Sequence, residues 1–139
     1  MFINSSIRIR NAGIIGHGIF TIEKLNKGIF VGEILLNGEQ PLHFNTDIES
    51  GRRVGRSANK LGYGNWRETY PLGRYVNHSY NPNCDVIEED SSINLVTNIE
   101  ILSRAELRYN YFDLAKIIKI PESDWEDIFY SKGIPQEIN

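Results

Sequence analysis

The sequence predicts a mostly β, α+β fold, and three features predict this class. Hydrophobic and polar residues alternate at residues 6–10 and 92–102, which is the pattern of half-buried strands. Apolar runs at residues 19–22 and 29–36 are separated by turn residues, as short strands are. After residue 112 the apolar residues take helical spacing. We therefore expect short strands in small sheets, followed by a few short helices.

Length and composition describe one globular domain. The chain has 139 residues, of which 40% are hydrophobic and 24% charged, so it can bury its own core. No apolar run approaches the ~18 residues of a membrane span, and the first residues lack the features of a signal peptide. We expect no membrane segment and an intracellular protein, cytoplasmic or, in a eukaryote, nuclear.

Turns and an insert separate the predicted strands. Residues 13–18 contain a Gly-His-Gly sequence, which predicts a tight turn, and residues 24–28 predict a second one. Residues 37–73 have weak periodicity and predict an irregular, variable insert. Residues 107–112 predict a short aromatic strand.

The tail is predicted to be helical. Residues 113–119 can form two helical turns before Pro121 ends them. Residues 123–126 read Ser-Asp-Trp-Glu, which fits a capping box. Trp125 and Phe129 are four residues apart and would lie on one helix face, packed on the core.

Charge is mildly acidic, with a formal net charge of −3. Acidic residues cluster at 85–90 and 122–127, whereas basic residues form only small groups at 8–10 and 52–56. If the acidic clusters flank a site, a basic protein or peptide is the more natural partner, although any one such cluster is more often a solvated surface. The weak basic groups predict no direct nucleic-acid binding.

Metal and disulfide chemistry is not expected. Cys84 is the single cysteine, which excludes an intrachain disulfide and a multi-thiolate zinc site. The three histidines, His17, His43 and His78, lack metal-ligand spacing. The chain also lacks the Gly-x-Ser-x-Gly elbow of serine hydrolases and the Walker loop of nucleotide-binding proteins.

Two segments remain as candidates for chemistry. Residues 74–84 read Arg-Tyr-Val-Asn-His-Ser-Tyr-Asn-Pro-Asn-Cys, and residues 106–111 read Glu-Leu-Arg-Tyr-Asn-Tyr. Taken alone, Asn77-His78-Ser79 can be a capped turn. Tyr109 and Tyr111 would face the same side of a strand and can be paired core residues.

Together these segments resemble the SET domain of protein lysine methyltransferases. Residues 74–84 resemble the motif R-F-I-N-H-S-C-x-P-N-C, and residues 105–111 resemble G-E-E-L-x-Y/F-D-Y. Residues 16–20 and 27–33 match the amino-terminal signature, G-x-G-x-F followed by K-G-x-x-x-x-E. The resemblance spans about residues 13–112.

The resemblance implies the SET fold, a β-clip arrangement of short twisted strands in small sheets with short helices and a threaded C-terminal segment. Residues 1–139 would then be a single SET domain. Its parts would be an N-terminal SET part at 1–36, the variable insert at 37–73, a C-terminal SET core at 74–112 and the helical tail at 113–139.

The implied activity is transfer of a methyl group from S-adenosylmethionine to a lysine amine. The implied substrate is a protein or peptide that carries a lysine, such as a histone tail, and a homodimer is allowed. Tyr111 would be catalytic, orienting the methyl group and the amine through its hydroxyl. Tyr109 would be the second catalytic residue, at the position where the family carries Tyr or Phe, and a tyrosine there implies mainly mono- or dimethylation.

The resemblance also implies a set of cofactor-binding residues. Gly16 and Gly18 would let the backbone approach the methionine end of the cofactor, Asn77 and His78 would hold it, and Arg74 would order the segment. The implied set is Gly16, His17, Gly18, Arg74, Asn77, His78 and Trp125. The aromatic residues available for a lysine channel or for packing are Tyr63, Trp66, Tyr70 and Tyr75.

The chain departs from the family at three points. Tyr80 replaces the usual cysteine, and Asn110 replaces the usual aspartate. A cysteine-rich tail, which binds zinc in some members, is missing, so no metal is expected and a tail aromatic, Trp125 or Phe129, would close the cofactor site. Two other functions stay open, a catalytically silent SET-like module that binds a basic peptide or partner, and a structural or oligomerisation domain with core tyrosines.

Overall fold

Two four-stranded sheets form the framework. The computed structural model describes residues 3–13, 16–37, 66–68, 72–89 and 92–137. The first sheet has the order β1-β2-β8-β5. It comprises β1 (Ile7–Asn11), β2 (His17–Thr21), β8 (Glu106–Tyr109) and β5 (Asn77–His78). The pairs β1–β2 and β2–β8 are antiparallel, whereas β5 and β8 run parallel.

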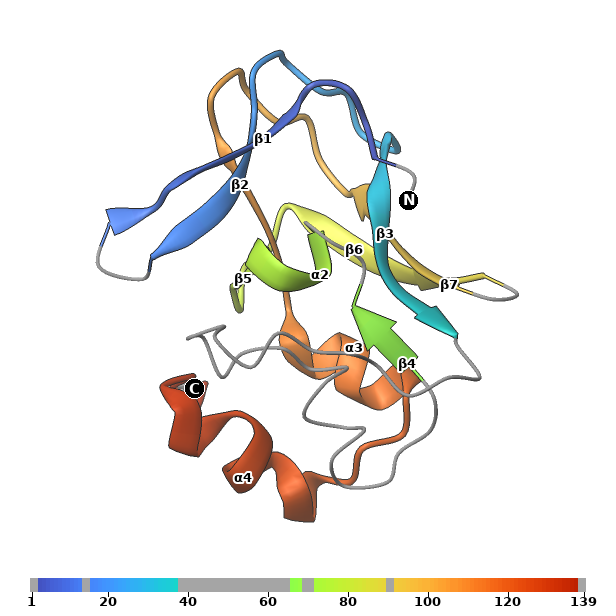
Figure 1. The fold of residues 1–139 in the computed structure, drawn as a ribbon, viewed down its shortest axis with the longest axis vertical. Coiled ribbons are helices and arrows are strands. Elements are labelled where there is room, and N and C mark those ends of the chain that lie inside the picture. The colour runs from blue at the N-terminus through green and yellow to red at the C-terminus, as the bar shows by residue number, and fades with distance from the viewer. Residues whose placement is uncertain (1–2, 14–15, 38–65, 69–71, 90–91, 138–139) are drawn as a thin grey trace.

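The second sheet is antiparallel throughout and has the order β4-β3-β7-β6. It comprises β4 (Trp66–Glu68), β3 (Phe30–Asn37), β7 (Ser92–Thr97) and β6 (Cys84–Glu88). Figure 1 shows β1 and β2 at the top of the molecule and the second sheet at its centre and right.

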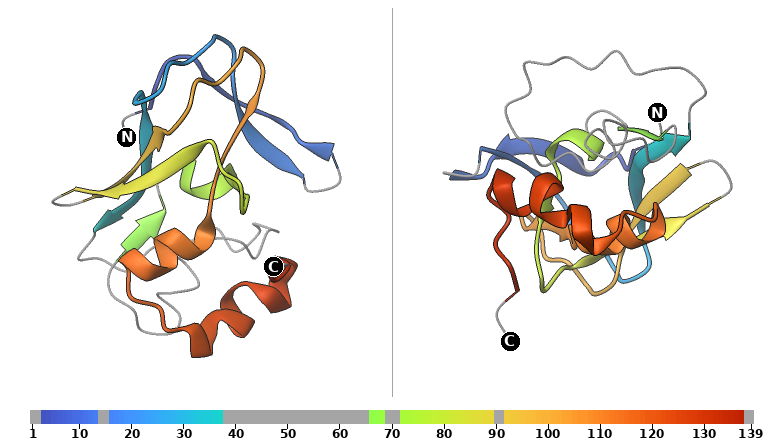
Figure 2. Two further views of the ribbon diagram at one scale, coloured as in Figure 1. Left: turned by 180° about the vertical axis from the view of Figure 1, so that it is seen from behind. Right: turned by 90° about the horizontal axis from the view of Figure 1, so that it is seen from below.

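Short helices complete the fold. They are α2 (Leu72–Tyr75), α3 (Tyr111–Ile117) and α4 (Trp125–Ile128), with 3-10 turns η2 (Glu122–Asp124) and η3 (Tyr130–Lys132). Figures 1 and 2 show α3 and α4 at one end of the molecule, below the sheets. Within the described residues, no helix has the length and apolar character to cross a membrane.

Strand pleating separates the core face of the first sheet from its outer face. Ile19 and Leu107 pair directly across β2 and β8, and both are fully buried. Phe20 and Glu106 form the adjacent pair, so their side chains project from the opposite face. By the same alternation Tyr109 lies on the core side with Leu107, and Arg108 lies on the outer side with Glu106.

The mostly β class is confirmed, and several element predictions are confirmed with it. The structure has strands at residues 7–11, 17–21 and 30–37, close to the predicted positions. The glycine turn is present, with positive φ at Gly13 and Gly16.

The predicted strand at residues 92–102 was too long. β7 ends at Thr97 because the chain then changes partners. The Asn98 N–H donates to the Asn83 carbonyl at 2.9 Å, and Ile101 forms an isolated bridge with Leu25. The last residues of the alternating pattern therefore do not pair within the sheet.

The prediction that Tyr109 and Tyr111 share a strand was wrong. β8 ends at Tyr109, and Tyr111 is the first residue of α3. Asn110 is the N-cap, and its side-chain oxygen accepts a hydrogen bond from the Phe112 N–H at 2.9 Å. Asparagine is a strong N-cap residue, as is the aspartate that it replaces, so either residue can begin a helix at this position. The helix predicted at 113–119 consequently starts two residues earlier and ends at Ile117.

The predicted capping box was also wrong. Ser123 lies inside η2, which follows Pro121, so Asp124 becomes the N-cap of α4 and makes no capping hydrogen bond with its side chain. The shared face of Trp125 and Phe129 is confirmed, since their ring centroids are 6.4 Å apart.

Most of the predicted insert lies outside the described residues. Its last part contains β4 and the start of α2, which the weak periodicity did not predict. The strand β6 and the two-residue strand β5 were missed as well. The reading of residues 77–79 as a capped turn is therefore wrong, because Asn77 and His78 pair with β8.

Cys84 belongs to the core of the second sheet. It is free and buried. Burial, and after it the adjacent Asp85 carboxylate, raises the pKa of the Cys84 thiol from 9.0 to about 12. The thiol therefore stays protonated at neutral pH and is chemically inert there.

Truncation of Leu95 should destabilise the fold. Leu95 is 0% exposed in the central strand β7. Leu95→Ala removes buried apolar surface and leaves a cavity, so the free energy of unfolding should fall by about 2 to 5 kcal/mol. Urea denaturation measures the change. The matched control is Leu102→Ala, since Leu102 is 67% exposed, and it should change stability by less than about 0.5 kcal/mol. Equal losses in both variants would contradict this assignment of the core.

Candidate functional site

The parallel pairing of β5 with β8 brings the two candidate segments together. Asn77 pairs with Arg108, and His78 pairs with Tyr109. The Ser79 N–H continues the ladder by donating to the Tyr109 carbonyl at 3.0 Å. Because β8 also pairs with β2, the glycine segment lies on the other side of the same strand. The site is thus built from three separate parts of the sequence.

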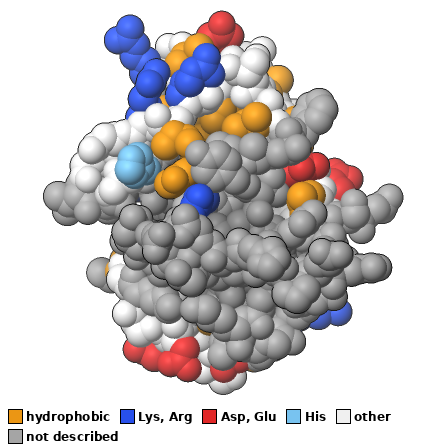
Figure 3. All heavy atoms as spheres, viewed as in Figure 1, with side chains coloured by type: hydrophobic (Ala, Val, Ile, Leu, Met, Phe, Trp, Pro, Cys, Tyr) orange, Lys and Arg blue, Asp and Glu red, His pale blue; other side chains and the backbone are white. Residues whose placement is uncertain are grey.

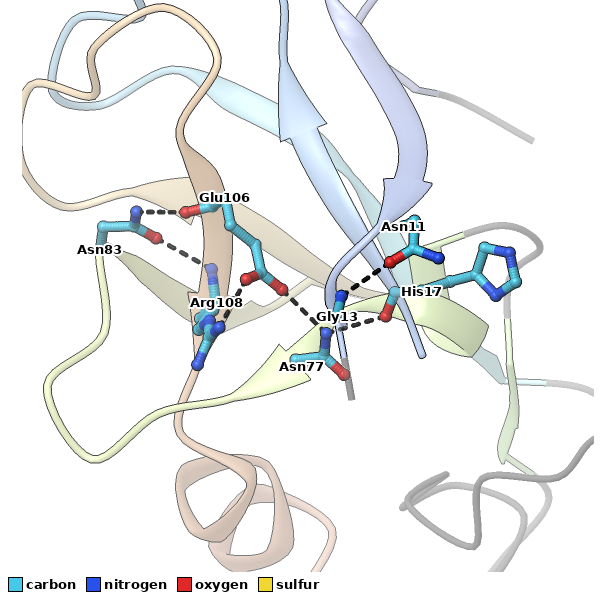
Figure 4. A network of polar contacts seen from close by, with 7 residues as sticks. All are labelled: Asn11, Gly13, His17, Asn77, Asn83, Glu106 and Arg108. Carbon is cyan, nitrogen blue, oxygen red and sulfur yellow. Dashed lines mark hydrogen bonds and ion pairs between the residues drawn. The ribbon is translucent and has the colours of Figure 1, made fainter. Parts of the chain in front are cut away.

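The side-chain amide of Asn77 is fixed by two acceptors. Asn77 is buried, and its Nδ2 donates to Glu106 Oε2 at 2.8 Å and to the His17 carbonyl at 2.9 Å (Figure 4). Both amide hydrogens are therefore used. The carboxamide oxygen Oδ1 is the remaining polar atom of this side chain, and it can accept a hydrogen bond from a ligand.

Glu106 is itself held on two sides. Its Oε1 forms an ion pair with the guanidinium of Arg108, with an N···O distance of 2.5 Å. Asn83 binds the backbone of the same part of β8. Its Nδ2 donates to the Glu106 carbonyl at 2.8 Å, and its Oδ1 accepts from the Arg108 N–H at 2.9 Å. Figure 4 shows these contacts as one continuous network that reaches from Asn83 to His17.

The two glycines of the amino-terminal signature are required for different reasons. Gly16 has φ of +91°, a conformation that favours glycine, and a Cβ added there would meet no atom within 4 Å. Gly18 lies in regular β2, but a Cβ added there would be 2.4 Å from Glu106 Oε2. The structure thus gives Gly18 a reason other than the expected approach of backbone to cofactor: it makes room for the Glu106 carboxylate.

His78 links the polar network to an aromatic cluster. Its Nδ1 accepts a hydrogen bond from the Tyr111 N–H at 3.0 Å, so the neutral imidazole carries its proton on Nε2. The His78 ring centroid lies 5.2 Å from that of Tyr111 and 5.5 Å from that of Phe112. The bond to Tyr111 joins the start of α3 to β5.

The two candidate catalytic tyrosines are buried and adjacent. Tyr109 is 6% exposed, Tyr111 is 2% exposed, and their ring centroids are 5.0 Å apart. The hydroxyl of Tyr111 donates to the Val76 carbonyl at 2.5 Å. This bond directs the hydroxyl proton to the carbonyl, so toward any further group the oxygen can act only as an acceptor. Although the expected shared strand is absent, the start of α3 brings the two rings together.

His17, Arg74 and Tyr75 lie at the edge of the site. The ring centroids of His17 and Tyr75 are 5.5 Å apart, and the Arg74 guanidinium carbon is 5.9 Å from the Tyr75 centroid. His17 is exposed, whereas the other two are half-buried. Figure 3 shows a histidine side chain beside hydrophobic side chains on one exposed face of the molecule.

The tail packs on the site through Phe112. The Phe112 ring centroid is 4.8 Å from that of Trp125 and 4.6 Å from that of Phe129. Phe129 also contacts Tyr111, with ring centroids 6.4 Å apart. Trp125 instead directs its indole N–H to the Ile120 carbonyl at 3.2 Å. Of the two tail aromatics considered, the structure brings Phe129 against a candidate catalytic tyrosine and places Trp125 behind Phe112.

Tyr80 anchors the end of the tail. Its hydroxyl donates to the Pro135 carbonyl at 2.5 Å, and its ring stacks on Phe112 with centroids 5.6 Å apart. Burial, followed by the nearby Tyr130 and Glu137, raises the pKa of Tyr80 above 10.0. The hydroxyl therefore remains a donor at neutral pH. The residue that replaces the family's usual cysteine thus fastens the tail through its ring and its hydroxyl.

The structure brings together most of the predicted site residues. Asn77, His78, Tyr109 and Tyr111 form its centre, and His17 contributes its carbonyl. The sequence analysis assigned no role to Glu106 or Asn83, although both lie within the quoted motifs, which was the signal that could have identified them. Of the other candidates, Tyr63 and Tyr70 lie outside the described residues, as does His43.

The potential metal ligands of the described residues are dispersed. In the part of the chain that the structure describes, no group of three or more His, Cys, Asp or Glu residues is placed to hold a metal ion. Glu122, Glu126 and Asp127 of the tail are exposed, and acidic side chains gather at the lower end of the molecule (Figure 3), where α4 lies.

Comparisons with known proteins identify the family. The family model for the SET domain matches residues 16–112. No curated protein matches the chain. Among solved structures, one similar chain is a Plasmodium falciparum protein provisionally described as a histone methyltransferase. It has a TM-score of 0.51 and 17% sequence identity, over 78% of this chain and 95% of that one. The family match covers more than half of the residues and both candidate segments, and we conclude that the chain belongs to the SET-domain family.

Proposed function

We propose that this protein transfers a methyl group from S-adenosylmethionine to the side-chain amine of a lysine in a protein substrate, adding one or two methyl groups. One observation carries the proposal: the pairing of β5 with β8 places His78 between its neighbour Asn77 and the buried pair of Tyr109 and Tyr111. Membership of the SET-domain family supports it, and so does the description of the structural neighbour.

The residues present fit this cofactor. The cofactor supplies an electrophilic methyl group on a sulfonium sulfur, and it carries an ammonium group that needs an acceptor. The Asn77 oxygen is such an acceptor, because both amide hydrogens are already donated elsewhere. His78 and the backbone of residues 16–18 would hold the cofactor beside it. His17 and Arg74 would line the exposed edge, with Trp125 in the supporting aromatic layer.

Tyr111 would orient the lysine amine. Its hydroxyl proton is held by the Val76 carbonyl, so its oxygen can accept an N–H from the amine. An amine that donates an N–H to Tyr111 keeps its own lone pair free to attack. Holding two reactants in this way supplies much of the acceleration for a displacement that needs no covalent enzyme intermediate.

Burial of the tyrosines also favours the neutral amine. A free lysine has a pKa of about 10.4, so little of it is neutral at pH 7. The buried rings of Tyr109, Tyr111 and Phe129 would desolvate the amine, and desolvation lowers the pKa of a cationic acid. The amine would then lose its proton to solvent before it reacts.

The proposed function is tested by transfer of a labelled methyl group. The protein is incubated with isotopically labelled S-adenosylmethionine and a mixture of histones and ribosomal proteins, with and without a chelator. We expect label on lysine, located by mass spectrometry, with equal transfer in both samples. Binding of S-adenosylhomocysteine without transfer to any lysine in the mixture would favour the silent binding module. Failure of binding and transfer together would favour a structural domain.

Replacement of Tyr111 should slow turnover. Tyr111→Phe removes the hydroxyl at the reacting centre and leaves the ring packing in place. The value of kcat should fall by at least about tenfold, with KM for S-adenosylmethionine within about threefold of the wild-type value. The control is Tyr130→Phe, which removes a tail hydroxyl and should leave both constants unchanged. Full turnover in a folded Tyr111→Phe protein would show that its hydroxyl has no such role.

Replacement of Tyr109 should change the product. A tyrosine hydroxyl there can hydrogen-bond to the amine, directly or through water, and each added methyl removes a bond and needs space. The wild type should therefore yield mainly monomethyl-lysine with some dimethyl-lysine. Tyr109→Phe should shift the product toward higher methylation and retain activity. Mass spectra of one peptide, treated to completion with each protein, measure the distribution. Trimethyl-lysine from the wild type would contradict the prediction, and so would an unchanged distribution in the variant.

A further inference from the structure

We infer that Glu106 is a positioning residue that holds the Asn77 carboxamide with its oxygen toward the cofactor, and that Gly18 is glycine because the Glu106 carboxylate occupies the space of its Cβ. The inference rests on the proposed function for the identity of the ligand. It rests on the structure for the contacts among Gly18, Asn77 and Glu106.

The orientation of the Asn77 amide depends on Glu106. A carboxylate oxygen is an acceptor only, so Glu106 Oε2 accepts from Nδ2 and would repel Oδ1. The His17 carbonyl imposes the same requirement from β2. With these two acceptors in place, a flipped amide would face two oxygens with its own oxygen. Without Glu106, only the His17 carbonyl would oppose rotation of the amide, and a rotated amide would present an N–H where the ligand's ammonium needs an acceptor.

Glu106 is placed firmly enough to impose this orientation. Its side chain is 12% exposed, and the Arg108 guanidinium binds Oε1, the oxygen that Asn77 does not use. Asn83 holds the backbone that follows Glu106, through the Glu106 carbonyl and the Arg108 N–H on either side of Leu107. The carboxylate therefore has one partner on each oxygen and a fixed strand beneath it.

Gly18 completes the arrangement. A Cβ at this position would lie 2.4 Å from Glu106 Oε2, 3.0 Å from Glu106 Cδ and 3.2 Å from the Ala12 Cβ, so the carboxylate, as the nearest group, would have to move. The oxygen that it would displace is the one that accepts from Asn77. Gly16 provides the contrast, because its constraint is a positive φ and no neighbouring atom is involved.

These contacts predict how substitutions at Glu106 and Gly18 affect ligand binding, alone and in combination. Glu106→Ala should weaken binding of S-adenosylhomocysteine by about tenfold, approaching the effect of Asn77→Ala. Glu106→Gln keeps an acceptor for Asn77 and should bind within about threefold of the wild type. Gly18→Ala should weaken binding in the wild-type background but change it less than about twofold when Glu106→Ala is present. Gly16→Ala is the matched control, and its effect should be the same in both backgrounds.

The experiment combines calorimetry with NMR on the full chain. Calorimetry with S-adenosylhomocysteine gives the affinities, and thermal unfolding of each variant shows whether it is folded. Spectra of 15N-labelled protein report the Asn77 side-chain amide, assigned from its disappearance in Asn77→Ala. Its two protons should be shifted downfield and protected from exchange in the wild type and in Glu106→Gln. In Glu106→Ala and in Gly18→Ala, the proton that faces Glu106 should lose both properties, while the other proton still has the His17 carbonyl as its acceptor.

Several results would overturn the inference. Wild-type affinity in Glu106→Ala, alongside a loss in Asn77→Ala, would show that Glu106 does not orient the amide. A Gly18→Ala effect of equal size in both backgrounds would show that Gly18 serves another purpose. If the wild type bound no S-adenosylhomocysteine, the proposed function and the ligand orientation would both fail, and the spectra would still decide whether Glu106 holds the amide.

Discussion

The parallel pairing of β5 with β8 is the interaction on which the rest of the site depends. β5 has only two residues, and its ladder places Asn77 beside Arg108 and His78 beside Tyr109. A strand this short has little stability of its own. It is held by Asn77 through Glu106 and by His78 through the Tyr111 N–H. The groups assigned to cofactor binding are therefore also the groups that stabilise the local fold.

Strand pleating places the polar and the aromatic groups of the site on opposite faces of the sheet. Glu106 and Arg108 alternate with Leu107 and Tyr109 along β8, so the polar pair projects from one face and the apolar pair from the other. Asn77 shares the polar face, and His78 shares the aromatic face with Tyr109. A charged network can thus orient an amide on one side, while a dry aromatic surface forms on the other. The strand β8 therefore separates the charged network from the aromatic surface, in which an unpaired charge would be destabilising.

The tail is attached by aromatic packing. Phe112 contacts Trp125, Phe129 and Tyr130 on the tail and Tyr80 on the loop after β5. The Tyr80 hydroxyl then binds the Pro135 carbonyl near the end of the described chain. Aromatic pairs and one hydrogen bond therefore hold the tail against the site. The position of Phe129 against Tyr111 follows from this packing.

The sequence by itself determined the mostly β class, the glycine turn and the order of motifs that identifies the family. These signals are local: alternation and turn preferences act over a few neighbouring residues. Only the tertiary structure decided that Tyr111 begins a helix and still meets Tyr109, and that Phe129 rather than Trp125 contacts it. It also decided that Asn77 finds its acceptor in Glu106, 29 residues away. The order of strands in the sheet determines which acceptor lies near a buried amide, and the amide must form its hydrogen bond with that acceptor.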